Sequence, residues 1–183
     1  RIYITDNAKW EESTAIHEYG HLFVHTQGGM PIAPDYCNGI CDDGDCGHCL
    51  WCEESDNIAF SEGIADWMSD SVTQDWASRY EYPALFKYNF ETLTLCDPND
   101  TTSFGYPFIT EGFFAALLRD IEDADGDWDQ YSPTYRDQLN LDPGDILDVL
   151  SFDQPHTSTA FVNAFLSRHL GEADSYWETC MNN

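Results

Sequence analysis

The sequence predicts a mainly α domain with a small β contribution (α+β). Three stretches carry apolar residues at helical spacing, and they cover residues 14–24, 58–78 and 111–122. One short segment at the start of the chain, residues 1–5, alternates like a β-strand instead. The chain has 183 residues, of which 42 % are hydrophobic and 15 % aromatic. This size and composition predict one domain over residues 1–183, with enough apolar side chains for one core.

The predicted strand at residues 1–5 leads into the first helix. Asp6 or Asn7 provides a start for this helix, which has acidic residues in its first turn. Glycines stop the helix at residues 27–29. The following stretch, about residues 30–57, is rich in Gly, Pro, Asp and Cys and shows no periodicity. We therefore expect a Cys-rich loop there.

The rest of the chain alternates between helical and irregular stretches. Residues 58–78 form the second predicted helix. Residues 80–95 are aromatic and β-branched, which predicts an extended or mixed segment closed by a turn. Residues 111–122 are almost wholly apolar in their middle, so they predict a buried central helix. Two further helices, about residues 145–152 and 157–169, close the domain.

The first helix contains the pattern H-E-x-x-H, with His17, Glu18 and His21 in the three fixed positions. Residues four apart share a helix face, so His17 and His21 can direct two imidazoles at one metal ion. Glu18 can then reach the open side of that ion. With six His and twelve Glu in the chain, the pattern has a chance probability of about 1 %. It is the layout of a zinc hydrolase.

A zinc hydrolase of this kind needs a third protein ligand. The metzincin pattern H-E-x-x-H-x-x-G-x-x-H requires Gly and His where this chain has Val24 and Gln27, so that solution fails. His25 lies within the apolar helix, and we interpret it as structural. The other solution takes a Glu from a second helix, and Glu62 in the segment S-E-G-I-A-D-W is the matching candidate.

The motif pair H-E-Y-G-H and E-G-I-A-D resembles the gluzincin zinc metallopeptidases, the thermolysin-like and fungalysin-like group. The resemblance implies a zincin-like metallopeptidase domain, in which an active-site helix pair binds one Zn²⁺ beside a central buried helix. It implies that Glu62 is the third ligand and that Asp66 accepts a hydrogen bond from a ligand imidazole. The resemblance covers about residues 10–27, 59–70 and, more loosely, 111–123. The connection between the two motifs is longer than in thermolysin, because the Cys-rich loop fills it.

The ligand set implies a reaction. Two neutral imidazoles and one carboxylate leave bound zinc with a positive charge and an open position, which lowers the pKa of a bound water to about 7. Glu18 would take its proton and pass it to the departing amine. This predicts a zinc-dependent endopeptidase. One alternative is a catalytically silent zinc- or calcium-binding interaction domain with the gluzincin fold, although an intact Glu18 argues against it. The other is an aminopeptidase, whose G-x-M-E-N motif this chain lacks.

The resemblance also implies a donor that stabilises the developing oxyanion. Thermolysin-like enzymes place a His just before the third core helix, where this chain has Phe108. Tyr106 is the nearest side chain that can donate a hydrogen bond, and Gly105 and Pro107 would give its loop a defined shape. We therefore predict Tyr106 as a catalytic residue. A core Tyr with a satisfied hydroxyl is an equally good interpretation, and His156 is a more remote donor.

A run of alternating acidic residues after the third helix is a candidate calcium site. Its four carboxylates are Asp123, Asp125, Asp127 and Asp129. Such oxygen ligands suit Ca²⁺, but Gly126 stands fourth rather than sixth in the run, so it is not an EF-hand. A calcium site and a solvated acidic turn both remain open, and structural calcium in the resembled family favours the first.

The seven cysteines predict disulfide bonds. Five lie in the Cys-rich loop and two elsewhere: Cys37, Cys41, Cys46, Cys49, Cys52, Cys96 and Cys180. We expect at least two disulfides within the loop, because a long polar loop has little core to hold it. The rival interpretation is a second metal site made by Cys46, His48, Cys49 and Cys52. Because seven is odd, at least one thiol stays free or pairs outside this chain.

The charge of the chain narrows the class of partner. Acidic residues number 34 against 7 basic ones, and the net charge is −27. This argues against nucleic acid and anionic membranes as partners. No apolar run approaches the length that spans a bilayer. We expect a protein or peptide substrate, secretion to an oxidising compartment, and a chain trimmed from a longer precursor.

Overall fold

The structure, a computed structural model, describes residues 12–31, 55–80, 109–122 and 139–172. In chain order its elements are α1 (Glu12–Thr26), α2 (Asp56–Tyr80), α3 (Glu111–Glu122), α4 (Pro143–Asp148), the π-helix η2 (Val149–Asp153), α5 (Ser158–Arg168) and the 3₁₀-helix η3 (Leu170–Glu172). The described ranges contain no β-strand. The prediction of a mainly α class is thus confirmed for this part of the chain.

Several predicted features lie outside the described residues. They are the strand at residues 1–5, the helix start at Asp6 or Asn7, most of the Cys-rich loop and the segment of residues 80–95 apart from Tyr80, which is the last residue of α2. The helix predicted at residues 58–78 is present as α2, and the one at residues 111–122 is present as α3 with the same bounds.

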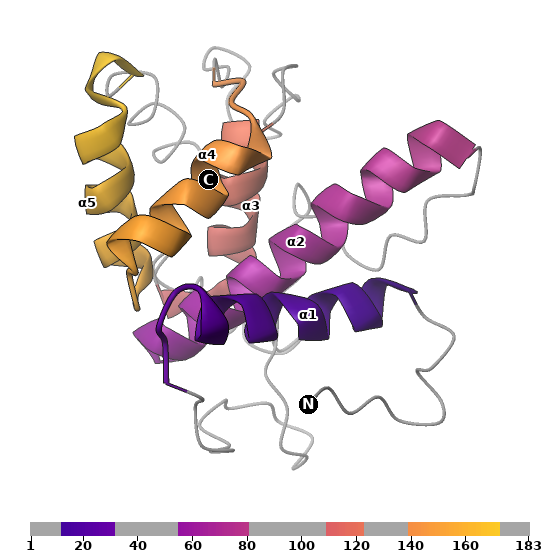
Figure 1. Ribbon diagram of the computed structural model, residues 1–183, viewed down its shortest axis with the longest axis horizontal. Coiled ribbons are helices and arrows are strands. Elements are labelled where there is room, and N and C mark those ends of the chain that lie inside the picture. The colour runs from indigo at the N-terminus through magenta and orange to yellow at the C-terminus, as the bar shows by residue number, and fades with distance from the viewer. Residues whose placement is uncertain (1–11, 32–54, 81–108, 123–138, 173–183) are drawn as a thin grey trace, which may run out of the picture.

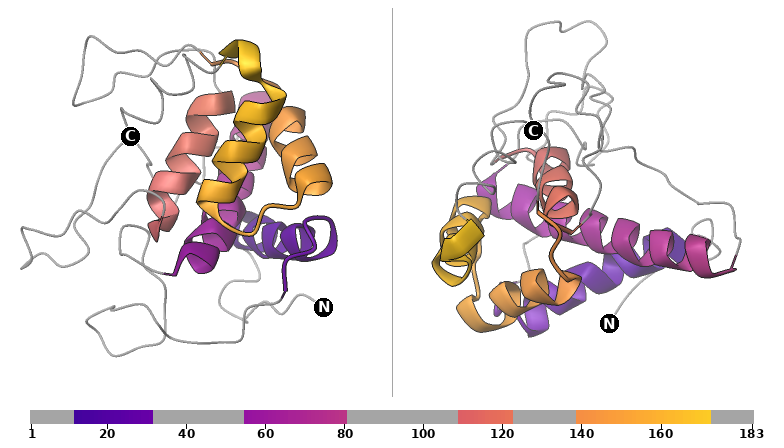
Figure 2. Two further views of the ribbon diagram at one scale, coloured as in Figure 1. Left: turned by 90° about the vertical axis from the view of Figure 1, so that its left-hand side faces the viewer. Right: turned by 90° about the horizontal axis from the view of Figure 1, so that it is seen from above.

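The helices are arranged around α2 (Figure 1). α1 lies across one side of α2, and α3 packs against another side, as the views in Figure 2 also show. α5 stands beside α3, and the segment that follows η2 contacts the C-terminal end of α1. Helix α2 therefore forms the middle of the described fold and contacts α1, α3 and α5.

Aromatic side chains form the centre of the core between α2, α3 and α5. The rings of Phe60, Phe114, Phe161 and Phe165 follow one another with centroid separations of 5.4, 5.5 and 5.9 Å. All four side chains are buried, and offset or edge-to-face pairs at such distances add to the stabilisation from burial. Aliphatic residues of α3 and α4 complete the cluster. The prediction that residues 111–122 form a buried central helix is confirmed by this packing.

The last two predicted helices differ in how well the sequence located them. α5 matches the prediction, with Thr157 as its N-cap, accepting from the backbone N–H of Ala160 at 3.1 Å. The helix predicted at residues 145–152 begins earlier, at Pro143, because Asp142 caps it and proline suits the first helical position. It then changes to a π-helix at Val149.

Helix α1 ends at the predicted glycines. The N–H of Gln27 donates to the carbonyl of Phe23 at 2.8 Å, and Gly29 has a φ of 65°, which glycine adopts without strain. The segment after the π-helix then holds this end. Gln154, itself left-handed at φ 49°, donates from Nε2 to the carbonyl of Gln27 at 3.0 Å. The His156 ring donates to the carbonyl of Gly28 at 3.2 Å.

Among the described residues, no helix combines the length and the apolar character needed to cross a membrane.

Candidate metal centre

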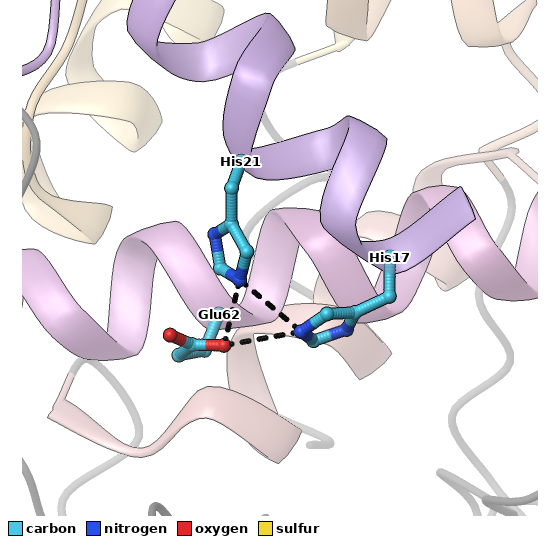
Figure 3. Close-up of side chains that lie close together, drawn as sticks. All are labelled: His17, His21 and Glu62. Carbon is cyan, nitrogen blue, oxygen red and sulfur yellow. Dashed lines mark hydrogen bonds and ion pairs between the residues drawn. The ribbon is translucent and has the colours of Figure 1, made fainter. Parts of the chain in front are cut away.

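Two neighbouring helices bring three predicted ligands together. His17 and His21 lie one turn apart on α1, and Glu62 lies in the second turn of α2. Figure 3 shows both imidazoles and the carboxylate directed at one another between the two helices. Within the described part of the chain, these three side chains are the group of His, Cys, Asp and Glu residues that could hold a metal ion.

The three facing atoms form a nearly equilateral triangle. The distance from His17 Nε2 to His21 Nε2 is 3.1 Å. Glu62 Oε2 lies 3.3 Å from the former and 3.1 Å from the latter. Ligands held about 2.0–2.1 Å from a zinc ion in a tetrahedron lie about 3.3–3.4 Å from one another. The triangle therefore has the dimensions of one face of a zinc tetrahedron, to within about 0.3 Å.

The chemistry of the three ligand atoms limits which metal ions suit the site. Two imidazole nitrogens and one carboxylate oxygen are the protein ligands typical of catalytic zinc, with a position left open. Calcium and magnesium prefer sites built from oxygen atoms alone. The Oε2 atom of Glu62 is buried, so a cation bound here would be partly shielded from water. The residues present fit zinc.

His17 is oriented by a buried carboxylate, as the resemblance implied. Its Nδ1 lies 2.9 Å from Oδ1 of Asp66, and Asp66 is only 5 % exposed. Because a carboxylate accepts and cannot donate, the hydrogen lies on Nδ1 and leaves Nε2 to face the metal. A hydrogen bond of this kind fixes the ring and raises its basicity as a ligand. Glu62 and Asp66 lie one helical turn apart on α2, which places both beside the same imidazole.

His21 is oriented by a different kind of group. Its Nδ1 lies 3.0 Å from Oγ of Ser61, the residue directly before Glu62. Sequence reasoning missed this contact, although the segment S-E-G-I-A-D-W contains the residue. The available signal was position, because Ser61 directly precedes the third ligand on α2. The two imidazoles are thus held by unlike partners, one anionic and one neutral.

Metal-free His17 sits in an anionic environment. Burial by itself lowers the pKa of this imidazole, but the hydrogen bonds and negative charges of Asp66 and Glu62 outweigh burial and raise the pKa from 6.5 to about 10. At neutral pH without metal, His17 is therefore an imidazolium that donates a hydrogen from each nitrogen. A metal ion would take the place of the proton on Nε2.

A second polar group fixes α2 on its α3 side. Glu122 accepts hydrogen bonds from Trp67 Nε1 at 2.9 Å and from Ser71 Oγ at 2.7 Å. Arg119 lies 3.5 Å from Glu122 and 3.7 Å from Asp70. All five residues belong to α2 and α3. They hold the helix that carries Glu62 in a defined register against the core.

The remaining predicted residues of the described part do not contribute ligand atoms to the triangle. Glu18 is half-buried on α1, directly after His17. His25 bonds through Nδ1 to the carbonyl of Met30 at 2.8 Å, which agrees with its interpretation as structural. His156, the remote oxyanion candidate, contacts the carbonyl of Gly28 at the end of α1.

Other predicted features lie outside the described residues. They are Tyr106, the acidic run Asp123, Asp125, Asp127 and Asp129, and all seven cysteines. The oxyanion donor, the calcium site and the disulfide bonds therefore stay predictions.

Comparisons with protein-family models, with curated protein sequences and with solved structures found no match.

Proposed function

We propose that this chain is a zinc-dependent peptidase of gluzincin type. One observation carries the proposal: His17, His21 and Glu62 present three ligand atoms 3.1–3.3 Å apart, the spacing of one face of a zinc tetrahedron. Further support comes from the partners behind the imidazoles, because Asp66 and Ser61 hold both rings by their Nδ1 atoms. Such outer contacts are typical of built metal sites.

The proposed roles follow from the positions of the residues. His17, His21 and Glu62 would hold the ion. Bound zinc supplies a Lewis acid and lowers the pKa of a water in its open position to about 7. Glu18, next to His17 on α1, would accept the proton of the attacking water and deliver it to the departing amine. Asp66 would stabilise His17 in the tautomer that leaves Nε2 available.

The finer parts of the proposal rest on the sequence. The endopeptidase assignment, the zincin-like fold and secretion follow from the resemblance of the motif pair and from the cysteines. Tyr106 is the proposed oxyanion donor, and Tyr106→Phe should lower turnover by roughly 10²-fold or more with zinc content unchanged. The acidic run that begins at Asp123 is the proposed calcium site.

Glu18→Gln tests the proposed function. Gln keeps the shape of the side chain but cannot accept the proton, so we expect stoichiometric zinc and a turnover reduced by roughly 10²–10⁴-fold or more. The assay is cleavage of an unstructured protein by the zinc-loaded chain, with and without a chelator, beside metal analysis of the same samples. A parent chain that binds zinc but cleaves nothing would favour the silent binding domain. Activity of Glu18→Gln close to that of the parent would remove Glu18 as the base.

A further inference from the structure

The two ligand helices meet at two small residues, Gly20 on α1 and Ala65 on α2. A Cβ atom placed on Gly20 would lie 2.7 Å from Cα and 3.2 Å from Cβ of Ala65. Ordinary van der Waals contacts measure 3.4–4 Å, so nothing larger than glycine fits at position 20 against this partner. Both residues are buried. The backbones of α1 and α2 are therefore in direct contact at this point.

This contact lies within the same helical turns as the metal ligands. On α1, Gly20 follows His17 by three positions and directly precedes His21. On α2, Ala65 stands in the same relation to Glu62 and Asp66. Residues three apart share a helix face. The small residue of each helix thus lies beside the side chains that form the triangle, and the spacing of the helices is set where the ligands leave the backbone.

Only two of the three edges of the triangle depend on the spacing of the helices. The edge between His17 and His21 lies within α1, whereas both edges to Glu62 join α1 to α2. Moving the helices apart therefore lengthens the two edges to Glu62 and leaves the His–His edge unchanged. A Cβ on Gly20 requires a movement of about 0.7 Å to reach an ordinary contact. Metal–ligand distances tolerate only about 0.2 Å.

We propose that Gly20, packed on Ala65, is a positioning residue that sets the size of the metal site and so selects zinc over larger ions. The proposal rests on the proposed zinc site. It assigns to the second x of H-E-x-x-H a role that the ligand pattern does not specify. It also predicts how the site would change if α1 and α2 moved apart. The bond from the ion to Glu62 would weaken first, and an ion with longer metal–ligand bonds would then bind better than zinc.

The test compares Zn²⁺ with Cd²⁺, two d¹⁰ ions that differ in size, in metal-binding titrations of the full chain. We expect Gly20→Ala to lower the zinc affinity by roughly ten-fold or more. Substitutions of residues that support the metal ligands typically have effects of this size. The cadmium affinity should fall much less, so the ratio of the two affinities shifts in favour of the larger ion. A general loss of stability would weaken both ions equally, and that result would overturn the proposal.

Gly63→Ala is the matched control, because it creates a contact of the same severity on the α3 side of α2. A Cβ on Gly63 would lie 2.8 Å from the carbonyl oxygen of Glu111 and 3.0 Å from the Phe114 ring. We expect lower stability with an unchanged ratio of zinc to cadmium affinity. Gly171→Ala, where nothing lies within 4 Å of the added atom, should change neither property.

Ala65→Ser carries the test if Gly20→Ala does not fold, since it enlarges the same contact by one atom from the other helix. A shift of the affinity ratio towards cadmium supports the proposal, and an unshifted ratio in a folded variant overturns it. A parent chain that binds neither ion would instead refute the zinc site itself. The failure of the proposed function is thus distinguishable from the failure of this inference.

Discussion

The two sides of α2 carry different kinds of side chain, polar on one side and apolar on the other. Towards α1, the helix presents Ser61, Glu62 and Asp66, which contact the two imidazoles. Towards the core, it presents fully buried apolar side chains such as Phe60 and Ile64. Adjacent residues therefore have separate tasks, because a polar side chain that orients a ligand contributes little buried apolar area, whereas the buried apolar side chains build the core. The comparison predicts that metal binding and stability can be changed independently by substitutions at neighbouring positions.

The largest effect is expected at Glu62. Glu62→Ala removes one corner of the triangle, so zinc should fall from one ion per chain to trace amounts, while the metal-free protein loses only the stability that the ion pair of Glu62 with His17 provides. Metal analysis and denaturation of the metal-free protein measure the two quantities. Asp148→Ala, an exposed carboxylate of α4, controls for the loss of one negative charge. Stoichiometric zinc in Glu62→Ala would reject the ligand assignment.

Substitution of Phe60 should have the opposite effect to substitution of Glu62, lowering stability and leaving zinc affinity unchanged. Phe60 is fully buried and packs on Phe114, so Phe60→Ala should lower the free energy of unfolding by about 3–5 kcal/mol. The zinc affinity of the folded protein should stay close to that of the parent. Urea denaturation without metal and a zinc titration below the unfolding transition provide the measurements. A large loss of zinc affinity in the folded protein would show that the two sides of α2 are coupled.

Ser61 lies between Phe60 and Glu62 in the sequence. Its substitution tests how much the orientation of a ligand contributes to zinc affinity. Ser61→Ala removes the hydroxyl beside His21 Nδ1, and we expect zinc affinity to fall by roughly 10–100-fold with little change in stability. Ser69→Ala is the matched control, because the Ser69 hydroxyl also reaches α1, donating to the carbonyl of Ser13 at 2.9 Å, away from the imidazoles. Equal zinc affinities of the two variants would mean that the contact of Ser61 with His21 is incidental.

Zinc binding should also change the number of bound protons. With its pKa raised to about 10, metal-free His17 contributes stability that is fully present below pH 6.5 and is lost as the pH rises through 10. Zinc must displace this proton, so zinc affinity should instead increase with pH over the same range. Calorimetric titrations in buffers of different ionisation enthalpy should report about one proton released at pH 7. A pH-independent zinc affinity between pH 6.5 and 10 would contradict this account.

The sequence predicted the ligand geometry better than its surroundings. His17 and His21, like Glu62 and Asp66, are each one turn apart, so a helix alone decides that they share a face. Ser61 and the contact of Gly20 with Ala65 depend on how two helices cross, and local periodicity contains no information about a crossing. The early start of α4 is a different case. Asp142 and Pro143 are both recognised start signals, but the apolar pattern that predicts a helix begins only after them, at Ile146.

The π-helix was not predicted, for a related reason. Residues 145–152 carry an ordinary helical pattern, and nothing in it marks the change of hydrogen bonding at Val149. The wider turn is followed by Gln154 in a left-handed conformation, which is unfavourable in isolation. Its side chain bonds to the end of α1, a residue more than a hundred positions away. Tertiary contacts of this kind stabilise a local geometry that the sequence disfavours.

The contacts of Gln154 and His156 with the end of α1 have a consequence for protein engineering and for sequence divergence. Because this end is held from the far part of the chain, the position of the two histidines does not depend only on the connection between α1 and α2. We therefore expect a variant with extra residues inserted between α1 and α2 to retain zinc binding, because the contacts of Gln154 and His156 with the end of α1 stay in place.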